Sequence, residues 1–258
     1  MEAAPGLAAE VLSIERAAFE AWQAEQVVPL GPWRVRFMHG VTDRANSVWA
    51  GPGMPESGFA RAAAEVEAFY AARARPALFQ ISPICDPRLD ALLAARGYER
   101  FDEVSVQVAR AADVARIAPR AGVLAGCDGE LSEAWFALSG TRGRFHGSAS
   151  VVYRAFLARI ASRAGFAWAR EAGASELGAV GLTIVAAPLA GVFSMLTAPE
   201  RRQRGLAEAV LGELARFALS RGAERLYLQV SADNAPACAL YARAGFRESH
   251  RYHYRRRA

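Results

Sequence analysis

The sequence has 258 residues, enough for one large domain or two ordinary ones, and 53% of them are hydrophobic, which allows a substantial core. No stretch approaches the roughly 18 consecutive apolar residues of a membrane helix, and the acidic start from Met1 to Glu15 does not resemble a secretory leader, so we expect a cytoplasmic protein. The three cysteines are too far apart for a disulfide framework or a metal knuckle, so no metal is expected. The net charge of +5 can attract a polyanion, and a solvated basic surface is the alternative.

A turn-rich segment from Arg44 to Pro55 precedes a helix that we expect at about residues 57–73. A strand, a turn, a helix and a second strand follow within Ala77 to Arg100. The same pattern returns from Leu226 to Glu248: an apolar run ending in Gln-aliphatic-Ser, a turn with Asp and Pro, a helix rich in Ala and Leu, and a Gly-aromatic pair. We interpret this repetition as two related domains in tandem, although alanine-rich sequences also produce such likeness by chance.

The expected boundary lies in the segment from Ala111 to Gly129, which is rich in glycine and weakly periodic, so we place the domains at residues 1–115 and 116–258. The second domain is predicted to contain helices at about 131–139, 149–163, 203–221 and 234–243, and strands at about 165–171, 177–187, 190–197, 225–231 and 246–255. An antiparallel meander followed by alternating strands and helices is typical of a mixed α/β domain.

The most informative stretch runs from Gly191 to Leu214 (GVFSMLTAPERRQRGLAEAVLGEL). A strand leads into a basic loop, and Gly205 then opens an amphipathic helix. The first turn of a helix offers backbone N–H groups and the positive end of the helix dipole, so it is a ready site for an anion. Gly205 removes a side chain where a phosphate would approach the backbone. The alternative is a loop of solvated arginines before an ordinary helix.

This stretch differs from two common phosphate-binding loops. It lacks the Gly-Lys-Ser/Thr ending of nucleoside triphosphate sites, so it does not imply magnesium, and it lacks the three glycines of a dinucleotide fingerprint. A pyrophosphate-bearing ligand that needs no metal fits the remaining features, and coenzyme A is such a ligand.

Two motifs resemble the signatures of the GNAT acetyltransferase superfamily. Arg202 to Ala207 (RQRGLA) is similar to the Gln/Arg-x-x-Gly-x-Gly/Ala motif, and Asn234 to Phe246 (NAPACALYARAGF) is similar to the second signature. The resemblance is clear over about residues 165–255. It implies two tandem GNAT-like domains, each with a mixed, mainly antiparallel sheet flanked by helices, of which the first is a degenerate copy and the second is catalytic.

The resemblance also implies a co-substrate and its contacts. In the family, main-chain amides of the first motif hold the coenzyme A pyrophosphate, and the pantetheine arm lies where the preceding strand, here Phe193 to Leu196, splays from the next, here Leu226 to Val230. Acetyl-CoA is the implied donor, with contacts at Leu196, Thr197, Arg202, Gln203, Arg204, Gly205, Leu206, Ala207 and Asn234. Tyr241 corresponds to a general acid, because a phenol with a pKa of about 10 can protonate a departing thiolate. Its alternative role is that of a core aromatic.

The sequence does not assign the general base. Family members often carry a glutamate on the strand that here reads Val192 to Leu196, and Ser194 is the only polar residue within it. Glu171, Glu176 and Glu208 are candidate carboxylates near the expected cleft. A water chain, or a base from elsewhere in the chain, is the alternative.

The first half has no comparable phosphate loop, so we expect it to bind no coenzyme A and to support the second half or to wall its acceptor site. Arg44, Asn46 and Trp49 are candidates for acceptor contacts, with the anchoring of a turn as the alternative. In the family, the loop after the first helix commonly borders the acceptor site, which makes candidates of Arg142, Arg144, Phe145 and His146.

The leading hypothesis is an N-acetyltransferase, monomeric or homodimeric, that moves an acetyl group from acetyl-CoA to the primary amine of a small molecule by direct attack on the thioester. A protein or peptide N-terminal acetyltransferase and a non-catalytic module that binds acyl-CoA are the alternatives. Nucleic acid is not expected as a partner, because it would require more basic patches with exposed aromatic residues. A membrane is not expected as a partner either, because no long apolar stretch is present.

Overall fold

The computed structural model describes residues 5–141 and 145–257, and the chain divides into two compact units. The first unit holds the chain up to Ser105, Ser231–Asp233 and the residues from Ser249 onward, and the second unit holds Val106–Val230 and Asn234–Glu248. This division differs from the expected one between residues 115 and 116. The difference arises because one long strand, Glu99–Arg110, contributes to both units, and most of the last strand, Arg247–Arg257, belongs to the first.

The first unit is a sheet with its helices placed on both faces. Its elements are α1 (Pro5–Ala21), β1 (Gln26–Leu30), β2 (Trp33–Phe37), the 3-10 helix η1 (Asp43–Ala45), β3 (Val48–Trp49), α2 (Glu56–Ala71), β4 (Ala77–Ile81), α3 (Pro87–Ala95), and parts of β5 (Glu99–Arg110) and β11 (Arg247–Arg257). The strands lie in the order β1-β2-β3-β4-β11-β5. The β1–β2, β2–β3 and β4–β11 pairs are antiparallel, and β3 and β4 are parallel.

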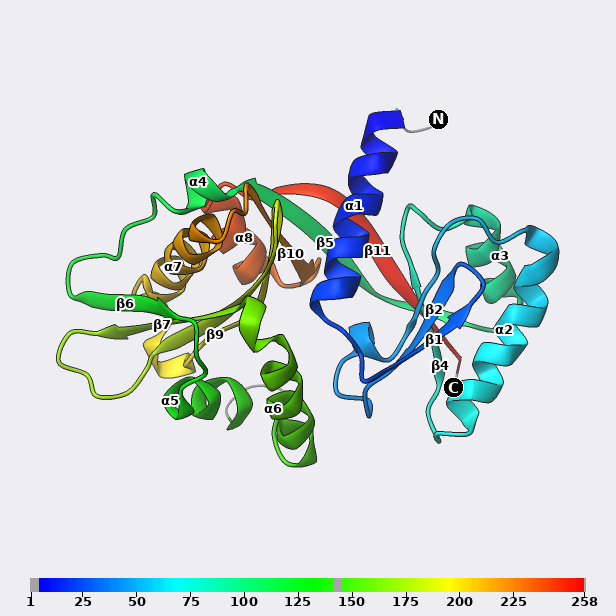
Figure 1. Ribbon diagram of the computed structural model, residues 1–258, viewed down its shortest axis with the longest axis horizontal. Helices are drawn as coiled ribbons and strands as arrows, with labels where there is room; N and C mark the ends of the chain where they lie inside the picture. Colours follow the sequence, from blue (N-terminus) through cyan, green and yellow to red (C-terminus); the bar gives the residue numbers. More distant parts are fainter. Residues whose placement is uncertain (1–4, 142–144, 258) are drawn as a thin grey trace. The chain divides into compact units, whose positions relative to one another are not determined.

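Alternation along the strands gives this sheet one apolar face and one polar face. Trp33 and Val35 of β2 and Phe79 of β4 pack with Phe59 of α2 and Leu93 of α3 in one buried cluster. Helices α2 and α3 accordingly lie along the same side of the sheet (Figure 1). The intervening strand residues project to the opposite face, which α1 covers.

The polar face is a buried hydrogen-bond network centred on Glu15 of α1. The Glu15 carboxylate contacts His250 Nε2 at 2.8 Å and accepts a hydrogen bond from Gln80 Nε2 at 3.0 Å. The Gln80 Oε1 atom in turn accepts one from the Arg36 guanidinium at 2.8 Å. Glu15, Arg36, Gln80 and His250 are all buried. The network therefore fixes α1 to strands β2, β4 and β11 of the same unit.

We expect Glu15→Ala to destabilise the first unit by about 3 kcal/mol, because it leaves the buried Gln80 amide and His250 ring without their acceptor. Urea unfolding measures the change. Glu25→Ala is the matched control, since Glu25 pairs with His39 through side chains that are about half exposed, and its loss should cost about 1 kcal/mol or less. Equal destabilisation by the two variants would contradict the role of the network.

The second unit is a twisted sheet between two pairs of helices. Its elements are α4 (Ala111–Val114), β6 (Val123–Asp128), α5 (Glu133–Phe136), the π-helical turn η2 (Ala137–Thr141), α6 (Ser148–Ile160), the 3-10 helix η3 (Ala161–Arg163), β7 (Ala164–Glu171), β8 (Ala179–Ala186), β9 (Leu189–Thr197), the 3-10 helix η4 (Pro199–Arg201), α7 (Leu206–Ser220), β10 (Arg225–Ser231) and α8 (Ala235–Arg243). The strands lie in the order β5-β10-β9-β8-β7-β6. The strands β6 to β9 pair antiparallel, and β10 pairs parallel with β9.

Helix α7 forms the centre of the larger core of this unit. Its apolar side, which includes Leu206, Val210 and Leu214, is buried with Leu228 of β10 and Tyr241 of α8. Helices α7 and α8 lie on one side of the sheet and α5 and α6 on the other (Figure 1). The predicted mixed α/β fold, with a mainly antiparallel sheet flanked by helices, is confirmed. In the described residues, no helix has the length and apolar character that crossing a membrane would require.

Candidate active site

The loop between β9 and α7 bends through two left-handed residues. After η4, Gln203 and Gly205 have φ values of +63° and +79°. Neither residue is helical, so α7 begins at Leu206, three residues later than predicted. The Gly205 carbonyl accepts the first helical hydrogen bond, from Ala209 N–H at 3.1 Å. The backbone N–H groups at the start of α7 therefore have no intrahelical acceptor.

The arginines of this loop differ in their contacts. Arg201 and Arg204 form ion pairs with Glu171 of β7, at 3.2 and 2.6 Å. Arg202, Gln203 and Arg204 are all exposed. Desolvation raises the pKa of the Glu171 carboxyl, but the hydrogen bonds from Arg204 and Arg201 outweigh it and hold that pKa below its ordinary value. Glu171 is thus a fixed anion that braces the loop, and it is a weak candidate for a general base.

Strands β9 and β10 separate towards their carboxyl ends, as the resemblance implied. They pair in parallel from Leu189 with Arg225 to Val192 with Leu228. From Phe193 to Thr197, β9 pairs with β8 on its other edge. Along these residues the edge that faces β10 has no strand partner in the described registers. Its backbone groups are available to a ligand that enters between the two strands.

A β-bulge shapes the same part of β9. The register passes from Leu182 with Phe193 to Val180 with Leu196, so β9 has one residue more than β8 between these pairs. Ser194 lies in the bulge and has a φ of +49°. A bulge redirects side chains and local backbone groups. Here it lies on the stretch of β9 that no longer pairs with β10.

Tyr241 lies on α8 with its ring in the core of the second unit. It is 8% exposed and contacts Phe246 edge to face, with ring centroids 5.9 Å apart. Burial, with a smaller contribution from Cys238, raises the pKa of the Tyr241 phenol to about 12. The hydroxyl therefore stays protonated at neutral pH and can only donate its proton when a strong base forms beside it.

Other predicted cofactor residues have identifiable structural roles. Asn234 caps α8, since its side-chain oxygen accepts a hydrogen bond from Ala237 N–H at 3.3 Å. The Leu206 side chain is buried, so only its backbone is open to a ligand. Ala207, Leu196 and Thr197 are half-buried.

The structure reveals a hydroxyl chain that the sequence did not indicate. Ser194 Oγ lies 2.8 Å from the hydroxyl of Tyr153 in α6, which lies 3.4 Å from Ser139 Oγ. Tyr153 is fully buried, and burial raises the pKa of its phenol to about 12. Its ring stacks on Phe145 with centroids 3.9 Å apart. The contact between the Ser194 and Tyr153 hydroxyls joins the bulge of β9 to α6.

Of the loop predicted to border the acceptor site, Arg142 and Arg144 lie outside the described residues. Phe145 is buried against Tyr153, and His146 is exposed. Phe145, which precedes α6, therefore packs against that helix and is not placed to contact an acceptor in solvent.

The candidate acceptor residues of the first unit make contacts within that unit. The Asn46 side-chain oxygen accepts hydrogen bonds from Met38 N–H and Gly40 N–H, at 2.8 and 2.9 Å. Trp49 is buried beside Phe19, with ring centroids 5.5 Å apart. For Asn46 the structure favours the alternative interpretation, in which it anchors a turn.

The first unit contains a parallel pair of its own, β3 and β4, and a thiol links the residues that follow these two strands. Cys85 Sγ donates to the Ala50 carbonyl, at 3.2 Å, and accepts from Ser82 N–H, at 3.4 Å. It thereby links the chain just after β3 to the chain just after β4. Burial raises the pKa of this thiol to about 12.

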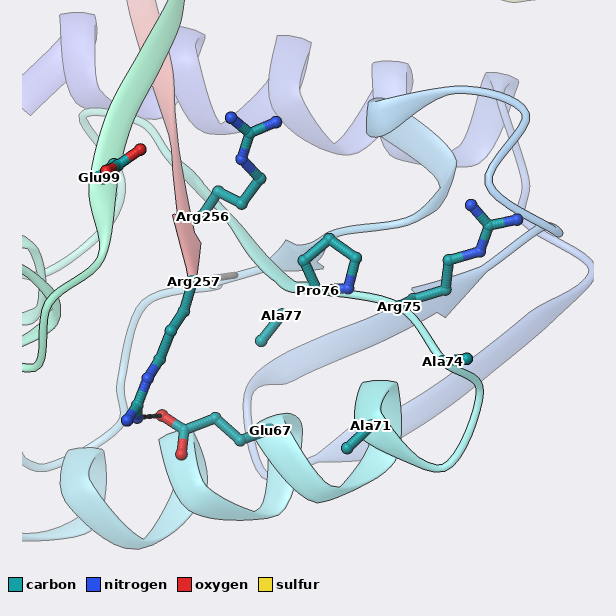
Figure 2. Close-up of a pocket in the computed structure, with 9 residues that line it drawn as sticks. All are labelled: Glu67, Ala71, Ala74, Arg75, Pro76, Ala77, Glu99, Arg256 and Arg257. Carbon is teal, nitrogen blue, oxygen red and sulfur yellow. Dashed lines mark hydrogen bonds and ion pairs between the residues drawn. The ribbon is translucent and has the colours of Figure 1, made fainter.

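Two cavities are lined by residues of the first unit. One, of about 410 Å³, is lined mainly by apolar residues near Cys85. The other, of about 720 Å³, lies beside the start of β4 and the end of β11 (Figure 2). Figure 2 shows its Arg257 side chain paired with Glu67, at 3.0 Å, while Arg75 and Arg256 point away from that pair.

Comparison with known proteins shows which family and which relatives the chain matches. Residues 8–255 match the family described as "Probable histone acetyltransferase Rv0428c C-terminal". The protein named "Uncharacterized N-acetyltransferase YobR" from Bacillus subtilis is 31% identical over 251 residues, which cover 95% of this chain and 98% of YobR. Both matches span nearly the whole chain, so they concern its two units together.

Two solved structures share the fold. A GCN5-related N-acetyltransferase from Kribbella flavida superposes with a TM-score of 0.71 at 18% identity, covering 98% of this chain and 96% of its own. A tandem GNAT protein from the clavulanic acid biosynthesis pathway superposes with a TM-score of 0.64 at 17% identity, covering 80% of this chain and 71% of its own. With the nearly full-length family match and the YobR relationship, these findings establish that the chain belongs to the GNAT N-acetyltransferases, in the family described above.

Proposed function

We propose that this GNAT enzyme transfers the acetyl group of acetyl-CoA to the primary amine of a small molecule, by direct attack of the amine on the thioester. The observation that carries the proposal is the coexistence, in one unit, of a left-handed turn at Gly205 before α7 and an unpaired edge of β9 only a few residues before it. A pyrophosphate at the turn and a thioester along the edge would be two parts of one extended ligand.

The turn is suited to a diphosphate. The N–H groups at the start of α7 and the positive end of its dipole attract an anion, and Gly205 presents no side chain. Arg201 and Arg204 are braced by Glu171, which keeps their positive charge close to the turn while Arg202 stays exposed. Within this arrangement the backbone of residues 203–207 would hold the pyrophosphate of the donor.

The chemistry then needs few groups. The amine nitrogen attacks the thioester carbonyl, the C–N bond forms, and the C–S bond of the donor breaks. A backbone N–H on the free edge of β9, next to the bulge at Ser194, would stabilise the negative charge that develops on the carbonyl oxygen. Tyr241 would give its phenolic proton to the departing thiolate and regain one from solvent. Most of the acceleration would come from holding the reactants together.

None of the three carboxylates that the sequence offered stands out, in the described part of the second unit, as a base for the attacking amine. Glu171 is held by two arginines, Glu208 is paired with Arg120 and Arg243, and Glu176 is exposed in a turn. We therefore assign the proton of the amine to solvent, with the Ser194 hydroxyl as a polar group that can orient the nitrogen from the bulge.

We assign the first unit a supporting role. In place of a basic phosphate loop, the segment between β3 and α2 is a turn of glycine and proline. The Cys85 thiol links the ends of the two strands between which a pantetheine arm would have to pass. This is why we place catalysis in the second unit alone.

Acetyl transfer to a protein is the second candidate. The description of the matching family as a probable histone acetyltransferase favours it. The two candidates share the donor site and the chemistry, and they differ only in the size and charge of the acceptor.

We expect acetyl-CoA at ~100 times its dissociation constant to stabilise the purified protein by about 2.7 kcal/mol, measured as a rise in melting temperature. Release of free thiol from acetyl-CoA, in the presence of a polyamine, an amino acid, an aminoglycoside or a lysine-containing peptide, then identifies the acceptor class. Turnover of a small amine supports the proposal, and turnover of the peptide alone replaces it with the second candidate. No stabilisation by acetyl-CoA would refute both.

A further inference from the structure

Arg120 lies directly over the turn that opens α7, although it comes from the segment that precedes β6. A β-carbon at Gly205 would lie 2.6 Å from Arg120 Cδ and 2.8 Å from its Nε. The guanidinium group continues past the turn and pairs with Glu208, in the first turn of α7, at 2.8 Å. The absence of a side chain at Gly205 therefore makes room for Arg120.

Glu208 holds a second arginine from another helix. Its other carboxylate oxygen lies 3.4 Å from Arg243 Nη2, at the end of α8. The side chains of Arg120 and Arg243 remain 60% and 63% exposed, whereas that of Glu208 is 24% exposed. One carboxylate thus holds two guanidinium groups that remain exposed to solvent. Each guanidinium group keeps N–H donors that a ligand can use.

This arrangement has an excess of positive charge. A single negative charge cannot neutralise two positive ones, and the excess lies at the end of α7 where the helix dipole is also positive. Exposed ion pairs contribute little to stability, so folding alone does not account for the gathering of charge. Positive groups held this way are suited to an anion that brings at least two negative charges.

The donor of the proposed reaction carries such a group apart from its pyrophosphate. Coenzyme A has a phosphate on the 3′ oxygen of its ribose, which dephospho-coenzyme A lacks. Because the backbone amides of the turn account for the pyrophosphate, we infer that Arg120 and Arg243, oriented by Glu208, bind the 3′-phosphate and select the phosphorylated cofactor. This inference rests on the proposed function, since it deepens the donor site of the second unit.

The test compares the binding of coenzyme A and of dephospho-coenzyme A by titration calorimetry. We expect the unmodified protein to bind coenzyme A more tightly than the dephospho form. Arg120→Ala and Arg243→Ala should each weaken the binding of coenzyme A by about ten- to a hundredfold, which is typical of one charge-assisted contact, and leave the dephospho form almost unaffected. Arg116→Ala is the matched control, because Arg116 is an exposed arginine of the same segment that pairs with Asp113.

The outcomes separate the inference from the function beneath it. If the unmodified protein binds both forms equally, the inference is wrong while the proposed function stands. If Arg243→Ala, which leaves the turn itself untouched, weakens both forms equally, Arg243 does not read the 3′-phosphate and the assignment is overturned. If neither form binds the unmodified protein, the proposed function fails, and the inference fails with it. Unchanged melting temperatures of the variants verify that each of them is folded.

Discussion

Gly205→Asp is expected to abolish the binding of acetyl-CoA, with a loss of affinity of at least about a hundredfold. The carboxylate would lie among the N–H groups intended for the pyrophosphate, so it would satisfy them and repel the ligand. The left-handed backbone of Gly205 and the proximity of Arg120 add strain to the variant. The change in melting temperature on addition of acetyl-CoA measures the effect, and the variant should show none.

A second glycine provides the control for the backbone strain that Gly205→Asp introduces. Gly173, in the turn after β7, has a φ of +83° and open space around the position of a β-carbon. Gly173→Asp imposes the same backbone penalty on the same unit without touching the start of α7, and it should respond to acetyl-CoA like the unmodified protein. A full response of Gly205→Asp would show that the diphosphate binds elsewhere.

Tyr241→Phe is expected to lower kcat by about two to four orders of magnitude on any accepted amine, because the departing thiolate loses its proton donor. The ring and its edge-to-face contact with Phe246 are retained, so the affinity for acetyl-CoA and the melting temperature should change little. Tyr98→Phe, the same substitution in the first unit, provides the control. Unchanged turnover of Tyr241→Phe would remove the phenol from the mechanism.

The raised pKa of Tyr241 gives this prediction a pH signature. A phenol with a pKa of about 12 remains protonated throughout the range in which the protein can be assayed. Ionisation of Tyr241 should therefore cause no loss of activity between neutral pH and about pH 10, whereas a phenol of ordinary pKa, about 10, would be half ionised there. A basic limb that appears near pH 9 and disappears in Tyr241→Phe would contradict the assignment.

The local features of the donor site could be predicted from the sequence, because they depend on neighbouring residues. The strand, the basic loop and the amphipathic helix follow one another within Gly191 to Leu214, and periodicity reveals such an order. The first residue of α7 could not be predicted with the same accuracy. Gln203 has a side chain that normally avoids positive φ, and nothing in the sequence signals that it adopts the left-handed region.

Contacts between residues far apart along the chain could not be predicted from the sequence. Arg120 and Glu208 are 88 positions apart, and Ser194 and Tyr153 are 41 apart. Each pair meets only because separate elements fold onto one sheet, and no periodicity or spacing records that meeting. The same reason explains why the sequence offered Glu171 and Glu208 as bases, since it could not show the arginines that neutralise them.

The domain boundary could not be read for a different reason. Glu99–Arg110 is one uninterrupted strand, and it contributes to both compact units without a change of composition. The glycine-rich segment that suggested a linker instead contains α4 and β6. A boundary inside a continuous strand leaves no loop, proline or charge run by which it can be recognised.

The membership of β11 in the first unit has a consequence for biosynthesis. β4 pairs with β11 from Ala77 with Arg257 to Ile81 with His253, so a nascent polypeptide that has emerged only as far as Ser105 lacks one of its strands. Until translation delivers β11, the hydrogen-bonding edge of β4 stays exposed, which is a hazard for aggregation. A single proteolytic cut cannot release the first unit intact, because its pieces come from both sides of the second.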